Sequence, residues 1–229
     1  MTTLDHPMHG IFIVKDRISA LTHFIAFLAA LAGMPLLLIK AASYHVDAMP
    51  ALAIFMGSMI LLYGASASYH AFNISPKVNL ILKRIDHCNI FLLIAGSYTP
   101  VCVMALPHEK GIVLLWIIWA AAVVGVIFKL FFVTCPRWLS SVLYIGMGWA
   151  CIRDIPLLIQ SLHTGFLWLM AGGVFYTVGG IIYALRLNLF KHPQQTGFGN
   201  HELFHLLVMA GSLCHFLTAM PFSMPFSEI

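Results

Sequence analysis

Charged residues are scarce in this sequence, and their scarcity decides the class of protein. Asp, Glu, Lys and Arg make up 9% of the 229 residues, whereas hydrophobic residues make up 61%. Soluble domains carry about 25% charged residues, so most of the surface of this chain cannot face water. Apolar runs of about 20 residues recur along the whole length, as membrane-spanning helices require. The composition predicts a polytopic α-helical membrane protein.

Several common motifs are missing as well. We expect no cleavable signal peptide, because residues 1–17 are mixed polar and the first apolar run, about 22 residues, is long for a signal peptide. The five cysteines form no Cys-x-x-Cys pair and lie in or beside apolar runs, where a thiol behaves as a small hydrophobic group. No glycine-rich phosphate loop and no nucleic-acid-binding motif occur. We therefore expect neither a disulfide framework nor a nucleic-acid partner.

Seven apolar runs predict an all-α fold, a bundle of seven transmembrane helices that forms a single integral membrane domain over residues 1–229. The fifth run is the weakest, because Arg153 and Asp154 interrupt it near its end. The connections are short and leave no room for a soluble domain. The approximate helix ranges are 18–39, 48–70, 86–106, 111–133, 138–158, 165–185 and 201–221.

Positive charges near the helix ends predict the orientation, since Lys and Arg are enriched in cytoplasmic loops. With the N-terminus in the cytoplasm, the cytoplasmic side receives the larger share of these residues. That share is Lys15, Arg17, Lys77, Lys83, Arg84, Lys129, Arg137, Arg186 and Lys191. The outer side receives Lys40, Lys110 and Arg153. We therefore expect a cytoplasmic N-terminus and an external C-terminus.

Polar residues of three predicted helices meet at one depth in the membrane. The second helix ends inside with Ser66 and His70, and the third begins inside with Asp86. The seventh begins inside with His201 and His205, which lie one turn apart on the same helical face. Two such imidazoles and a third from another helix make a three-histidine zinc site with an open position. We expect these three histidines to bind Zn²⁺.

Two carboxylates compete for the role of general base at this site. The segment "HELFH" matches the His-Glu-x-x-His pattern of zinc proteases, in which Glu202 would be the base. Glu202 follows His201 by about 100° around the helix, so it can face a neighbour instead. We prefer Asp86, which could accept a hydrogen bond from the water that zinc activates. Ser66 would hydrogen-bond Asp86 or the developing oxyanion.

The quoted motifs resemble those of a known family. "SASYH" from Ser66, "DHCNIFLLIAGSYTP", "LYIGMGW" and "HELFHLLVMAGSLCHF" are similar to segments of the bacterial hemolysin III family. That family is related to the progestin and adipoQ receptors, including the adiponectin receptors, and to the alkaline ceramidases. The resemblance implies a seven-helix protein of the bacterial inner membrane with zinc near the cytoplasmic side. It also implies that Asp86 contacts the zinc-bound water. The implied zinc ligands are His70, His201 and His205.

The resemblance leaves three functions open. The relation to ceramidases implies zinc-dependent hydrolysis of a lipid amide or ester, whereas the relation to receptors implies a regulator of membrane state with a structural zinc. The family name suggests a pore-forming haemolysin, but no charged stripe runs the length of any predicted helix. A site among apolar helices in the inner leaflet is accessible to an acyl chain. We therefore expect a membrane lipid as substrate or ligand and favour the hydrolase.

Overall fold

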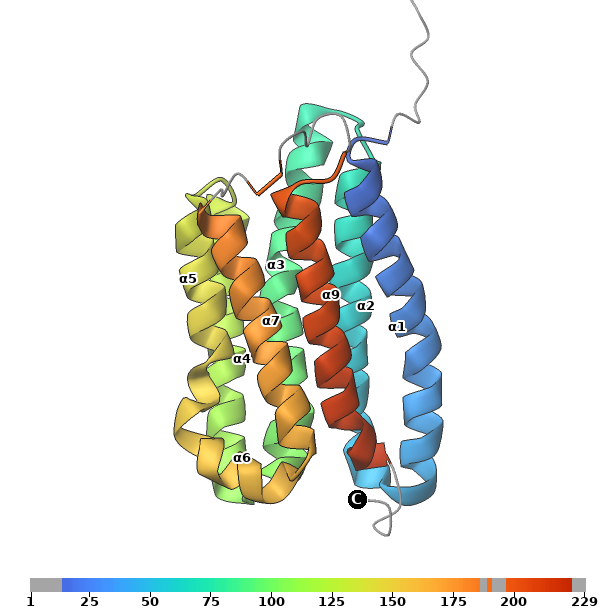
Figure 1. Cartoon of the computed structure of the whole chain (residues 1–229), viewed down its shortest axis with the longest axis vertical. Coiled ribbons are helices and arrows are strands. Elements are labelled where there is room, and N and C mark those ends of the chain that lie inside the picture. Colours follow the sequence, from blue (N-terminus) through green and yellow to red (C-terminus); the bar gives the residue numbers. More distant parts are fainter. Residues whose placement is uncertain (1–13, 186–188, 191–196, 224–229) are drawn as a thin grey trace, which may run out of the picture.

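The structure, a computed structural model, describes residues 14–185, 189–190 and 197–223. Within this part of the chain every regular element is helical, and the long helices run side by side along one axis (Figure 1). The first four α-helices are α1 (Arg17–Tyr44), α2 (Met49–Ala71), α3 (Pro76–Pro100) and α4 (His108–Phe132). The others are α5 (Arg137–Gly148), α6 (Ile155–Leu162), α7 (Gly165–Leu185) and α9 (Asn200–Ala219).

Seven of the described segments are long and apolar enough to cross a membrane, which confirms the predicted seven-helix fold. The fifth span is composite, because α5 and α6 are joined by a 3₁₀ turn at Ala150–Asp154. This turn contains the two charged residues that interrupt the fifth run in the sequence. Pro156 follows in the first turn of α6. A proline is tolerated there because the first N–H groups of a helix have no partner within it, but the same residue would interrupt a helix that continued from α5.

The third helix begins earlier than the sequence predicts. Its predicted start is residue 86, whereas α3 begins at Pro76 with Ser75 as its N-cap. The Ser75 hydroxyl accepts a hydrogen bond from the backbone N–H of Val78 at 3.3 Å, and proline at the first helical position suits a helix start. These first turns are polar, so hydropathy did not detect them. They extend α3 beyond its neighbours at the end of the bundle where α1 begins (Figure 1).

The apolar side chains divide between the interior and the outer face. One buried cluster joins α1, α2 and α9 around residues such as Leu52 and Phe55, and a second joins α3 to α6 around Ile118 and Leu158. Large apolar side chains also point outward, and Trp116 of α4 is 74% exposed. An apolar exterior suits a helix that faces lipid on one side.

The helix directions place the predicted polar residues at one end of the bundle. α1 and α9 begin at the end where α2 finishes and α3 begins (Figure 1). The common depth of these helix ends is therefore confirmed, while the assignment of that end to the cytoplasm stays a prediction. Arg186 and Lys191, two residues of the positive-charge pattern, lie outside the described residues.

Candidate metal centre

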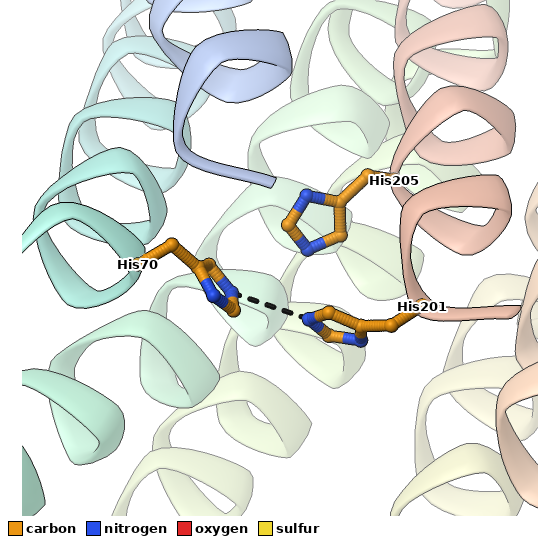
Figure 2. A group of neighbouring side chains, drawn as sticks. All are labelled: His70, His201 and His205. Atoms are coloured by element: carbon orange, nitrogen blue, oxygen red, sulfur yellow. Dashed lines mark hydrogen bonds between the residues drawn. The ribbon is translucent and has the colours of Figure 1, made fainter. Parts of the chain in front are cut away.

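The site lies where the last turn of α2 meets the first turns of α9. His70 is the penultimate residue of α2, and His201 and His205 follow each other on one face of α9 (Figure 2). Glu202 fixes the start of α9, because its Oε2 accepts a hydrogen bond from the backbone N–H of Gly199 at 2.8 Å. A carboxylate in the first turn also suits the positive end of the helix dipole.

The three imidazoles are arranged as ligands of one ion would be. One nitrogen from each ring lies within 4.8 Å of the others, in a group that could hold a metal ion. His70 Nε2 and His201 Nε2 are 3.2 Å apart (Figure 2). A tetrahedral zinc ion with Zn–N bonds of about 2.0–2.1 Å places its ligand nitrogens roughly 3.3 Å apart. The separation of these nitrogens therefore fits a zinc ion held by the three histidines.

Asp16 orients the first of these rings. Its Oδ2 lies 2.9 Å from His70 Nδ1, and its backbone N–H donates to the His70 carbonyl at 2.9 Å. This hydrogen bond with His70 lowers the pKa of Asp16, which keeps the carboxylate ionised. A proton held on Nδ1 leaves the Nε2 lone pair facing His201, an arrangement common among metal-bound histidines. Sequence reasoning gave Asp16 no role, although it directly precedes the first span at the depth of His70.

A fourth histidine packs against the site. The rings of His23 and His205 are stacked, with centroids 3.7 Å apart and planes 7° from parallel. His23 also meets Tyr63 edge-on at 5.1 Å, and neither of its ring nitrogens has a hydrogen-bond partner among the described residues. Stacking fixes the orientation of the His205 ring. The sequence gave no signal for this contact, because His23 lies on α1 and its register against α9 is set by packing.

The structure brings both predicted catalytic residues to the histidines. Asp86 is 8% exposed and Ser66 is 1% exposed, and both line the cavity that His201 and His205 also line. All five predicted site residues therefore lie together, and their chemical roles stay predictions.

Glu202, the rival base, is already engaged. Its Oε1 accepts a hydrogen bond from the Ser19 hydroxyl at 2.6 Å, and its Oε2 is taken by the Gly199 N–H. These contacts fasten α9 to α1 and complete the first turn of α9. Asp86 is therefore the carboxylate that faces the cavity beside the histidines, which supports our preference for it.

The cavity extends from this polar end deep into the bundle. Its wall is formed mainly by α3, α5, α7 and α9, and apolar side chains such as Leu93, Ile94 and Phe166 predominate. It reaches His215, which lies ten residues beyond His205 and therefore about 15 Å further along α9. The site thus combines a donor set for a metal, a buried carboxylate and a long apolar space.

Seven membrane-spanning helices with a buried three-histidine cluster at one end define a heptahelical membrane protein with a candidate metal centre. The chain belongs to the haemolysin-III-related family, whose model matches residues 12–216. This match confirms the resemblance in the sequence motifs. With its spans and bacterial relatives, the chain is an integral membrane protein of the bacterial plasma membrane.

The relatives fall into two groups. Hemolysin-3 of Bacillus cereus is 36% identical over 93% of this chain and 94% of its own length. The Hemolysin-3 homolog of Bacillus subtilis (strain 168) is 36% identical over 91% of this chain and 95% of its own length. The adiponectin receptor protein of Drosophila melanogaster is 24% identical over 85% of this chain. This chain covers 48% of that longer receptor.

Proposed function

We propose that this protein is a zinc-dependent hydrolase that cleaves an amide or ester bond of a membrane lipid at the cytoplasmic leaflet. One observation carries the proposal: the three-histidine cluster and a buried carboxylate meet at the polar end of a long apolar cavity. A metal needed only to brace helices requires neither the carboxylate nor the cavity.

Each site residue has a separate role in the proposed hydrolysis. His70, His201 and His205 would hold zinc, which when bound lowers the pKa of water to about 7 and polarises a carbonyl. A carboxylate oxygen of Asp86 would accept the proton of the attacking water, a contribution of about 10²–10⁴-fold in rate. The Ser66 hydroxyl, which lines the same cavity, would hydrogen-bond that carboxylate or the developing oxyanion.

The cavity supports a lipid substrate. Its apolar wall can receive an acyl chain and exclude water, whereas a small soluble substrate would gain little from it. The histidine cluster lies at the end of the bundle that the positive charges assign to the cytoplasm. A lipid of the inner leaflet would therefore present its amide or ester near the site.

The decisive test is the substitution Asp86→Asn in purified protein. The amide keeps the size of the side chain and all three histidines, so zinc content and folding should persist while turnover falls by about 10²–10⁴-fold. The matched control is Asp47→Asn. Asp47 is an exposed carboxylate between α1 and α2, at the end of the bundle opposite to the site. Both variants and the wild type would be assayed in bilayers on a panel of ceramides, acyl amides and esters. Full turnover by the Asp86→Asn variant would refute the assignment of the base.

The names of several relatives favour alternative functions. The adiponectin receptor protein and the progestin and adipoQ receptor-like protein 1 of Caenorhabditis elegans are named as receptors, which favours a regulator with a structural zinc. The Hemolysin-3 relatives favour a haemolytic pore. A zinc-loaded wild type that cleaves no lipid of the panel would favour the regulator. Ion conductance across liposomes would favour the pore.

A further inference from the structure

A further histidine lies deep in the cavity, away from the metal centre. His215 lines the cavity about 15 Å beyond His205 along α9. Within the described part of the chain its ring makes no hydrogen bond. Both ring nitrogens of His23 are closed off from the cavity, whereas those of His215 keep accessible surface. Because polar groups inside proteins are normally hydrogen-bonded, this imidazole lacks a partner that a ligand in the cavity can supply.

Two glycines hold the ring of His215 between α7 and α9. A Cβ at Gly172 of α7 would lie 2.7 Å from His215 Nε2, so only glycine leaves room for the imidazole. In the same way, a Cβ at Gly211 of α9 would lie 2.6 Å from Cε1 of Tyr176. The two rings stack with centroids 5.3 Å apart, and the Tyr176 hydroxyl is hydrogen-bonded to the Ser212 hydroxyl at 2.9 Å. The imidazole is therefore preorganised for a ligand.

Nearby polar groups of the cavity wall already have partners. The Tyr98 hydroxyl donates to the Gly148 carbonyl at 2.7 Å, and the Thr177 hydroxyl donates to the Gly173 carbonyl at 2.7 Å. A buried water typically makes about three hydrogen bonds, and this mainly apolar space offers few free partners. A polar group carried on a longer apolar ligand does not need them, because burial of the apolar part supplies the affinity. Such a group suits His215 better than a free water.

The cavity continues beyond His215 toward the other end of the bundle. α7 runs antiparallel to α9, since Gly172 faces His215 and Gly179 faces Leu207. Phe166, which lines the cavity, precedes Gly172 by six residues and therefore lies about 9 Å further from the metal centre. A chain that extends from the histidine cluster would pass His215 before it reached Phe166. His215 would thus meet the middle of the chain rather than its end.

We propose that His215 binds a hydroxyl group in the middle of a lipid acyl chain. A neutral imidazole has one donor and one acceptor nitrogen, and a hydroxyl can pair with either. Apolar wall residues on both sides would receive the methylene groups that flank the hydroxyl. The placement of the amide or ester at the histidine cluster rests on the proposed hydrolase, which would then prefer lipids with a hydroxylated acyl chain. The contact at His215 does not depend on turnover.

Binding is measured with free fatty acids, which contain no amide or ester to cleave. The three probes are oleic acid, ricinoleic acid and α-hydroxyoleic acid. Ricinoleic acid is oleic acid with a hydroxyl in the middle of the chain, whereas α-hydroxyoleic acid has its hydroxyl next to the carboxylate. Affinities for the purified, zinc-loaded protein in detergent would be determined by titration calorimetry. The wild type should bind ricinoleic acid at least as tightly as oleic acid.

Variants of one cavity residue and a matched control locate the contact. His215→Leu should bind ricinoleic acid about tenfold more weakly, because the buried hydroxyl loses its partner. It should bind oleic acid and α-hydroxyoleic acid as the wild type does. His215→Gln, which keeps a donor and an acceptor, should retain part of the ricinoleic acid affinity. Ser97→Ala should change none of the three affinities, because Ser97 lines the same cavity but donates to the Ile94 carbonyl.

Three outcomes would overturn the proposal. A wild type that binds ricinoleic acid about tenfold more weakly than oleic acid would mean that the cavity leaves the hydroxyl unpaired. An affinity ratio of these two acids that His215→Leu does not change would exclude the contact. An equal effect of His215→Leu on α-hydroxyoleic and ricinoleic acid would exclude recognition at this depth. A wild type that shows the expected binding but cleaves no lipid would refute only the hydrolase.

Discussion

Replacing Asp16 should weaken the metal centre without removing a ligand. The carboxylate lies 2.9 Å from His70 Nδ1, on the side of the ring opposite to the nitrogen that faces His201. Loss of such an outer contact typically costs 10–100-fold in metal affinity. The Asp16 side chain is 40% exposed, so solvent screens part of the interaction. We therefore expect a loss near the lower limit, about tenfold, which corresponds to about 1.4 kcal/mol.

The measurement is a zinc titration of purified protein against a chromogenic chelator. Asp16→Ala should bind zinc about tenfold more weakly than wild type and still reach one ion per chain at saturation. Asp16→Asn should fall between the two, because its amide oxygen can still accept a hydrogen bond but carries no charge. Asp47→Asn should match wild type. An Asp16→Ala variant with unchanged zinc affinity would refute the orienting role derived from the 2.9 Å contact.

Three further predictions concern the ligands, the topology and the rival carboxylate. Metal analysis should find one zinc per chain in wild type and none in a His201→Ala/His205→Ala double variant; full occupancy of that variant would contradict the ligand assignment. A reporter in the 186–200 connection should be cytoplasmic, and one fused at the C-terminus should be external. These positions lie mostly outside the described residues. The opposite pattern would overturn the predicted orientation. Glu202→Gln should lower thermal stability, through a weaker charge-assisted hydrogen bond worth about 1.5–3 kcal/mol, and should spare more turnover than Asp86→Asn. Equal losses of turnover would return Glu202 to consideration as the base.

The spans and the clustering of the site residues could be predicted because their signals are local in the sequence. A run of about 20 apolar residues is sufficient to identify a membrane helix, and an i,i+4 pair such as His201 and His205 shares a helical face in any helix. Alternation of the spans then fixed the depth of His70 and Asp86. No partner had to be known for any of these steps.

The remaining features depend on information that hydropathy does not contain. The first turns of α3 are polar, so only the capping residue Ser75 and the following proline indicate the true start. The stacking of His23 on His205 requires the rotation of α1 against α9, which packing decides. Asp16 is an intermediate case, because the depth argument places it level with His70 but cannot show that the two side chains meet.

The contacts of α1 explain how two distant helices keep the ligands in register. Asp16 holds His70 of α2 through its side chain and its backbone N–H, and Ser19, one turn later, holds Glu202 of α9. α1 therefore fastens both ligand-bearing helices near the site. A hydrogen bond to a charged group contributes about 1.5–3 kcal/mol, and solvent reduces this contribution at Asp16, whose side chain is 40% exposed. Two such contacts from neighbouring turns would resist separation of α2 from α9, which would pull His70 away from His201.

Asp86 takes no part in the hydrogen bonds that hold α1 to α2 and α9. It is contributed by α3 and lines the cavity, whereas Asp16 and Glu202 join helices through their hydrogen bonds. A buried carboxylate is costly in a membrane protein unless it is paired or functional. A structural metal site would gain nothing from such a group at the cavity wall, since the three histidines already fit zinc. The position of Asp86 is therefore the feature that favours the proposed hydrolytic centre over a brace between helices.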